Sequence, residues 1–141
     1  MQLHAVEKDQ MIANWKSTTT SVKDGLRTIE KEFVNLKSNN TFNLVMLVSV
    51  QKNQSYIKDL RIEASGIWKV HENILVRVIK EISIPTVQDA NQISQESIDN
   101  LAANFKFKLQ NNPIHINTIK FLNQNSLILI NEKHIETTYS K

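Results

Sequence analysis

The 141-residue chain contains no cysteine, only two glycines and only two prolines. The absence of cysteine excludes thiolate nucleophiles, iron–sulfur clusters and cysteine-based zinc sites, and it fits both oxidising and reducing compartments. The two glycines, Gly25 and Gly66, stand far apart, so a phosphate-binding loop, a dinucleotide fingerprint or a nucleophile elbow cannot be built. The sequence therefore discloses no reaction, and we expect a non-enzymatic protein.

Long apolar runs and blocks of one charge are also missing. The longest apolar run, 44–48, has the length of a strand, whereas a membrane-spanning helix needs ~20 apolar residues. Lysines and arginines (17) are interspersed with aspartates and glutamates (14), so we expect no nucleic-acid partner. The N-terminus shows no charged region followed by an apolar one. We therefore expect a periplasmic or cell-envelope protein if an export signal has been removed, and otherwise a cytoplasmic one.

Alternation of apolar and polar residues is the strongest positive signal, and it predicts β-strands. Every even position from Phe42 to Val50 is apolar, and similar patterns follow over 56–64, 68–70 and 74–82. In the last of these, Arg77 and Glu81 mark the polar face. Two further strands are predicted at 11–18 and 28–36, separated by Asp24-Gly25, a dipeptide typical of tight hairpins.

The chain changes character after Pro85, which closes this meander of strands. A polar stretch follows, and Ser94 or Ser97 can cap a helix near residues 95–111 with apolar residues at helical spacing. Asn112-Pro113 ends this helix because proline disfavours helical backbone in the residue before it. Three short strands are then predicted at 114–121, 126–131 and 134–139.

Together these elements predict a mainly β fold of about eight antiparallel strands in up-and-down order with one inserted helix. Eight such strands can close into a barrel, which removes exposed sheet edges. We expect one barrel domain over 11–141 after an N-terminal tail, 1–10. A two-sheet sandwich is less favoured because it needs longer crossovers, and an open, strongly curved sheet would show the same alternation.

Several short motifs resemble bacterial lipocalin-like domains, a family of small secreted or lipid-anchored proteins. The strongest is Ser65-Gly66-Ile67-Trp68-Lys69-Val70 with Asn73 and Leu75, and weaker ones are Ala13-Asn14-Trp15-Lys16-Ser17, Ser38-Asn39-Asn40-Thr41-Phe42, 119–130 and Tyr139-Ser140-Lys141. Ala13 and Asn40 depart from the family pattern, since both replace glycine. The resemblance implies a lipocalin-like barrel in which Trp15 packs across the closed end against Lys141. It implies no activity, because a fold does not carry a function with it.

The ligand-binding hypothesis places a small apolar or amphipathic molecule inside this barrel. Lys58 and Lys80 fall on the apolar faces of their strands, so each lies either at the rim, with its ammonium in water, or in the interior beside an anionic head group. No cofactor or metal is expected, because the four histidines lack ligand spacing. The candidate ligand-binding residues are Lys58, Trp68, Lys80, Phe42, Met46 and Tyr56; Leu44, Leu60, Ile62, Val76 and Val78 are also expected to line the interior.

A protein-interaction module is the alternative hypothesis. In this interpretation the barrel is filled, and an outer face binds a protein partner or a second copy, as in an inhibitor, an immunity protein or a secretion accessory protein. Val45, Leu47, Leu75 and Ile79 are predicted on the outer face, where they would form an apolar patch unless the helix covers them. The charged groups in 30–32 and 80–81 are expected to point outward and discourage edge-to-edge aggregation.

Overall fold

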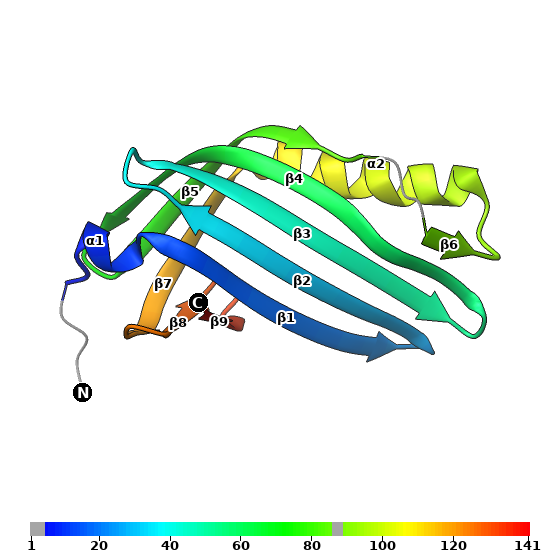
Figure 1. Ribbon diagram of the computed structural model, residues 1–141, viewed down its shortest axis with the longest axis horizontal. Helices are drawn as coiled ribbons and strands as arrows, with labels where there is room; N and C mark the ends of the chain where they lie inside the picture. The colour runs from blue at the N-terminus through cyan, green and yellow to red at the C-terminus, as the bar shows by residue number, and fades with distance from the viewer. Residues whose placement is uncertain (1–4, 86–88) are drawn as a thin grey trace.

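The computed structural model describes residues 5–85 and 89–141 (Figure 1). Its elements are α1 (Lys8–Met11), β1 (Ala13–Lys23), β2 (Leu26–Leu36), β3 (Thr41–Lys52), β4 (Ser55–His71), β5 (Ile74–Ser83), β6 (Asp89–Asn91), α2 (Gln95–Asn111), β7 (Ile114–Leu122), β8 (Ser126–Ile130) and β9 (Glu136–Ser140). The helix predicted near 95–111 is confirmed, and part of the polar stretch before it, 86–88, lies outside the described residues.

Eight of these strands form a closed antiparallel barrel. The order around the ring is β1-β2-β3-β4-β5-β7-β8-β9, with β9 returning to β1. The short strand β6 pairs with β4 outside this ring, at Tyr56, Ile57 and Lys58. The predicted barrel is therefore confirmed, in place of a sandwich or an open sheet.

The first four strands are long and continue past the C-terminal strands (Figure 1). Helix α2 covers the inner face of this extension. It begins at Ser94, whose side chain accepts a hydrogen bond from the Ser97 backbone N–H at 3.1 Å, and Pro113 follows its end. A second apolar core therefore lies between α2 and the strands, formed by Val48, Ile57, Leu60, Ile62 and Ile98 with flanking residues that include Leu101, Phe105 and Leu109.

The opposite end of the barrel is closed by α1 and by two tryptophans. The indole N–H of Trp15 donates to the backbone oxygen of Met11 at 2.9 Å, and that of Trp68 donates to Lys37 at 2.9 Å. Lys141 Nζ lies 5.2 Å from the centre of the Trp15 ring, in the contact that the resemblance implied. The strand predicted from residue 11 begins instead at Ala13, because 8–11 form a helical turn with Met11 fully buried. Residues 1–4 of the predicted tail lie outside the described part.

Gly66 permits a close approach between β4 and β5. A Cβ atom at this position would lie 1.8 Å from the Val78 backbone oxygen, so only glycine fits. The register between the two strands shifts at this point, between Ser65 and Gly66. Gly66 therefore allows the bulge that bends β4 and β5 into the barrel wall.

The face predicted for β5 is wrong. Leu75 and Ile79, expected outside, are buried in the core, and Arg77 points inward between them. The reason is the register between β4 and β5, because directly opposite residues point to the same face of the sheet. Arg77 lies opposite the buried Trp68, and Ile79 lies opposite Gly66. Both faces of 74–79 are apolar apart from Arg77, so alternation alone cannot choose between them.

Two further predicted orientations also need correction. Glu32, expected to point outward, faces Arg77 across the barrel interior. Tyr56 is only half-buried, and Ile57 takes the core position instead. A register shift between Val48 and Val50 and a left-handed backbone at Asp59 reverse the pattern there. Leu60 and Ile62 are buried as predicted.

Candidate functional site: a polar cluster inside the barrel

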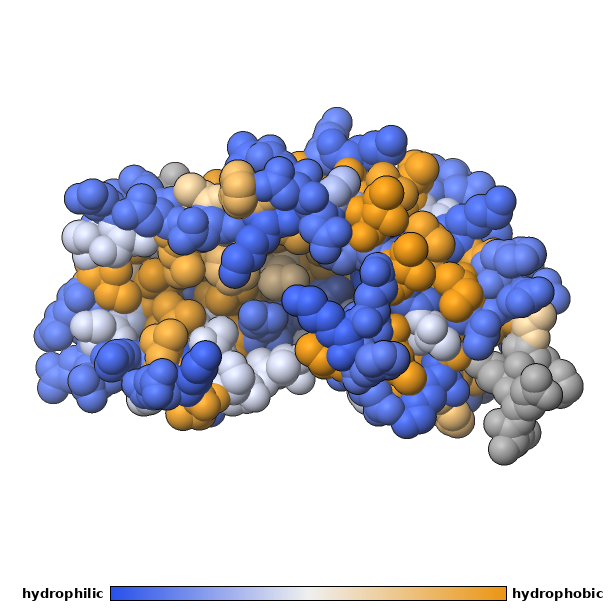
Figure 2. All heavy atoms as spheres, turned by 180° about the vertical axis from the view of Figure 1, so that it is seen from behind, coloured by the Kyte–Doolittle hydropathy of each residue, from blue (hydrophilic) through white to orange (hydrophobic). Residues whose placement is uncertain are grey.

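A cavity of about 190 Å³ lies inside the barrel, between its closed end and α2. One wall is apolar and comes from β3, β5 and α2, and the other is polar and comes from β2, β5, β7, the β8–β9 loop and β9. Figure 2, seen from the side opposite to Figure 1, shows that this face of the molecule is hollowed near its centre, with apolar side chains on both sides of the hollow and hydrophilic ones along its edge. The lining residues are Glu32, Phe42, Leu44, Met46, Arg77, Ile79, Leu109, His115, Asn117, Asn131, Thr137 and Tyr139.

Four of the polar residues are connected by hydrogen bonds and an ion pair, and His115, opposite Arg77 in the strand register, completes the cluster. One terminal nitrogen of the guanidinium donates to Asn117 Oδ1 at 3.0 Å, and the other lies 3.6 Å from Glu32 Oε1. The Tyr139 hydroxyl donates to Glu32 Oε2 at 3.0 Å. The side chains of Arg77 and Glu32 are only 11% and 18% exposed, so this ion pair is shielded from solvent far more than a surface pair.

Two atoms of the cluster have no hydrogen-bond partner. Arg77 Nε and His115 Nε2 are the buried side-chain nitrogen or oxygen atoms without a partner in the described part of the chain. A buried donor that makes no bond costs ~1–3 kcal/mol, so such groups in folded proteins call for an explanation. Both residues line the same cavity, so a molecule in that cavity can supply the missing partners after side-chain rotations that bring the two buried nitrogens to the cavity surface.

Burial also sets the protonation states of the cluster. Desolvation, together with the positive charge of Arg77, lowers the pKa of His115 below its usual 6.5. Burial and the neighbouring Glu32 carboxylate raise the pKa of Tyr139 well above its usual value. At neutral pH both side chains are therefore uncharged, and the charges in the cavity wall are those of Arg77 and Glu32.

The predicted ligand-binding residues are divided between several places. Phe42 and Met46 line the cavity. Trp68 is buried at the closed end, where it hydrogen-bonds Lys37. Lys58 and Lys80 are exposed, and neither they nor Tyr56 line the cavity.

Sequence reasoning missed the polar side of the site. Arg77 and Glu32 were assigned to outward faces, His115 was treated as an isolated histidine, and Asn117 was not considered. Tyr139 was named only as part of a structural motif. The sequence nevertheless contains a signal for the inward direction of Arg77. A two-residue turn at Glu72-Asn73 pairs His71 with Ile74, and three residues further along each strand it pairs Trp68 with Arg77.

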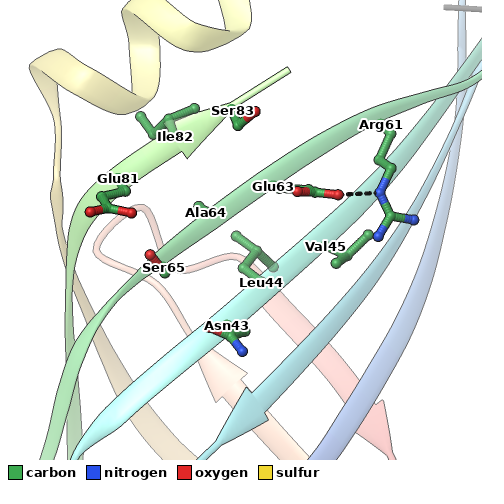
Figure 3. A pocket seen from close by; sticks show the side chains of 10 residues that line it. All are labelled: Asn43, Leu44, Val45, Arg61, Glu63, Ala64, Ser65, Glu81, Ile82 and Ser83. Atoms are coloured by element: carbon green, nitrogen blue, oxygen red, sulfur yellow. Dashed lines mark hydrogen bonds and ion pairs between the residues drawn. The ribbon is translucent and has the colours of Figure 1, made fainter. Parts of the chain in front are cut away.

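A second concavity of about 420 Å³ lies on the outer side of β3, β4 and β5 (Figure 3). Its charged residues are Arg61, Glu63 and Glu81, and Arg61 Nε lies 2.5 Å from Glu63 Oε1. This pair is about half exposed, so it contributes little to stability. Neither of the two unpartnered buried atoms lies here, so we favour the interior cavity as the functional site.

The apolar patch on the outside of the barrel differs from the predicted one. Leu75 and Ile79 belong to the core, and Val45 and Leu47 are half-buried. The outer face of β4, β5 and β7 instead carries two cross-strand rows, one of Ile67, Val78 and Ile114 and one of Val76 and Ile116. We call these five residues the β5–β7 patch; Ile67, Ile114 and Ile116 are its most exposed members.

The fold and the site define the class of this protein: a closed eight-stranded antiparallel barrel with a polar cluster facing an interior cavity. No protein-family model matches the chain, and no curated protein shows a significant match to it. Among the described residues, no helix combines the length and apolarity needed to cross a membrane. Within that same part, no three His, Asp or Glu side chains are grouped closely enough to hold a metal ion.

Proposed function

We propose that the protein is a non-enzymatic, lipocalin-like carrier that binds a small amphipathic carboxylate inside the barrel. The observation that carries this proposal is the pair of unpartnered atoms, Arg77 Nε and His115 Nε2, in the wall of one cavity. A carboxylate offers several acceptor lone pairs and forms its strongest hydrogen bonds with guanidinium. Because the other ring nitrogen of His115 donates to the Asn112 backbone oxygen, Nε2 donates to the same head group when the bound carboxylate favours the protonated imidazole.

The opposite wall suits an apolar chain. Phe42, Leu44, Met46, Ile79 and Leu109 face the polar cluster across the cavity. A ligand that is polar at one end and apolar at the other satisfies both walls at once, as in most small-molecule sites. The volume of about 190 Å³ lies below the ~300–1,000 Å³ of drug-sized sites, so we expect a short chain.

Calorimetric titration with three six-carbon probes tests the proposal. Hexanoate, hexanol and hexylamine share one apolar chain and differ in the head group. We expect hexanoate to bind most tightly, because it accepts from Arg77 and favours the protonated, donating form of His115, and hexylamine to bind most weakly, because its ammonium only donates and is repelled by Arg77. Equal affinity for the three probes, or no binding of any, would overturn the proposal and leave the cavity as a site for ordered water.

A pair of arginine variants identifies the head-group site. Replacing Arg77→Met removes the guanidinium from the cavity, and we expect at least a tenfold loss of hexanoate affinity, because a hydrogen bond to a charged group contributes ~1.5–3 kcal/mol. The matched control is Arg61→Met, which breaks the exposed pair with Glu63 on the outer face and should leave affinity unchanged. The double variant Glu32→Gln/Arg77→Met tests the same loss without an unpaired buried carboxylate.

We also propose a periplasmic or cell-envelope location, supported by the resemblance to secreted domains. Fractionation of the source cells, with detection of the full-length native protein, tests this proposal. Recovery in the cytoplasmic fraction alone would contradict it, and it would leave the carrier function untouched.

Protein interaction is the second candidate function, and the β5–β7 patch favours it. Scattered exposed apolar residues are ordinary, whereas adjacent rows across three strands form a continuous surface. Lys69 lies beside Val76 in register, and Lys8 lines the same side of the patch, so a partner with carboxylates around an apolar surface would fit. We expect Ile116→Lys to abolish retention of such a partner in affinity purification, with Phe107→Lys, an exposed position on α2, as the control.

A further inference from the structure

Strand β1 is paired very unequally on its two sides. All 11 of its residues pair with β2, from Ala13 opposite Leu36 to Lys23 opposite Leu26. Towards β9 it forms a single register pair, Lys16 with Ser140. Figure 1 shows the short strands β8 and β9 beside the first part of β1 only. Over Thr18–Lys23 the second side of β1 therefore has no strand partner among residues 5–85 and 89–141.

This edge lacks the features that usually protect an exposed strand. Natural edges carry proline, a bulge or charged side chains that discourage pairing. Residues 18–22 of β1 are Thr-Thr-Thr-Ser-Val, with no proline and no charge, and their pairing with β2 is regular. Threonine and valine also favour strands. Val22 is 69% exposed, which makes it the most exposed large hydrophobic residue of the described chain.

We infer that this edge pairs with the same edge of a second copy, so that two barrels share one continuous antiparallel sheet. The pairing segment lies between Ser17, next to the β9 contact, and Lys23, next to the turn, and its centre is Thr20. A two-fold axis there places Thr20 opposite its own copy, Thr19 opposite Ser21, and Thr18 opposite Val22. This register keeps inward-facing residues opposite inward-facing residues.

Self-pairing fits this edge better than addition of a foreign strand. Directly opposite residues interact through their side chains, and Thr–Thr and Thr–Ser pairs hydrogen-bond favourably. No like charges face each other in this register, and Thr18 of the other copy packs against the exposed Val22 side chain. Such an interface is isologous, so it closes as a dimer and does not continue into a fibre.

The cysteine-free sequence allows a direct test of the register. Opposite residues have Cβ atoms ~4.5–5.5 Å apart, close to the separation that a disulfide spans. Thr20→Cys alone should therefore form a covalent dimer on mild oxidation, read on a non-reducing gel. Thr18→Cys and Val22→Cys should cross-link efficiently only when the two variants are mixed. Gln124→Cys, at an exposed turn, is the control for random collision.

Sedimentation equilibrium of the unmodified chain gives the second readout. We expect a dimer, and we expect Thr20→Lys to raise its dissociation constant at least tenfold, because like charges placed opposite each other cost several kcal/mol. Gln124→Lys adds the same charge elsewhere and should change nothing. A monomer at all concentrations, a dimer unaffected by Thr20→Lys, or cross-linking of Thr20→Cys no faster than Gln124→Cys would overturn the inference.

Discussion

The two halves of the barrel interior differ in how completely their polar atoms are paired. At the closed end, the indole N–H groups of Trp15 and Trp68 both reach backbone oxygens, and both rings belong to the apolar core. In the cavity half, Arg77 Nε and His115 Nε2 are buried without partners. The closed end is organised for stability, whereas the cavity half retains unsatisfied donors at a cost to stability. Variants at the closed end should therefore change stability alone, whereas variants in the cavity half should change ligand binding as well.

The largest effect on stability is expected at the closed end. Trp15 is almost completely buried among Met11, Leu36 and Phe42, and removing a buried tryptophan costs ~3–5 kcal/mol. We expect Trp15→Ala to lower the free energy of unfolding in urea by about this amount. A change under ~1 kcal/mol would show that this end is loosely packed and would remove the contrast between the halves.

The second-largest loss of stability is expected when the ion pair in the cavity is broken. Arg77→Met leaves the Glu32 carboxylate without its cation, and we expect the free energy of unfolding to fall by about 2–3 kcal/mol. This is below the ~3–5 kcal/mol for fully buried pairs, because both side chains keep some exposure. The double variant Glu32→Gln/Arg77→Met should recover most of this loss in the same urea titration. Failure of the double variant to recover would mean that Arg77 stabilises the barrel through its packing.

The pH dependence of stability should also originate in the cavity half. Because burial lowers the pKa of His115 in the folded state, the unfolded chain binds more protons as the pH falls below 6.5, and folding loses free energy there. We expect His115→Gln to flatten the decline in stability as the pH falls below 6.5. His134→Gln, at an exposed position, is the control and should not change the pH dependence of stability. Equal effects of the two variants would contradict the assignment of this pH dependence to His115.

The smallest effect is expected where the closed end meets the last strand. Lys141→Met removes the ammonium that lies over the Trp15 ring, a contact with a typical value of ~0.5–1 kcal/mol at exposed sites. Thermal unfolding should show a correspondingly small decrease in midpoint. Hexanoate affinity should not change, since Lys141 does not line the cavity.

Much of the fold could be predicted from the sequence because its signals are local. Alternating residues, Asp24-Gly25 and the Ser94 cap predicted the strands, the first hairpin and the helix, but β1 continues five residues past its predicted end at 18, and 56–64 and 68–70 belong to one strand, β4. Residues 24 and 25 both have left-handed backbones, as a tight hairpin requires. The first turn of helix at 8–11 gave no comparable signal, because four residues are too few to show periodicity.

The candidate site could not be predicted in the same way, because it depends on register and on distant pairs. Arg77 and Glu32 lie in different hairpins, and each is a charged residue in a strand, which ordinarily indicates an outward face. His115 and Tyr139 join them only after β7 and β9 close the ring. Alternation detects a strand but cannot assign its faces where both are apolar, as in 74–79.

The most direct test of the central claim is an NMR titration of the arginine Nε–H signals with hexanoate. The chain has three arginines, Arg27, Arg61 and Arg77, so few signals need assignment, and Arg77→Met identifies the one from the cavity. We predict that hexanoate shifts the Arg77 Nε–H signal in a saturable manner and leaves those of Arg27 and Arg61 in place. An unchanged Arg77 signal at saturating hexanoate, or equal shifts of all three, would contradict the claim that the polar cluster binds a carboxylate.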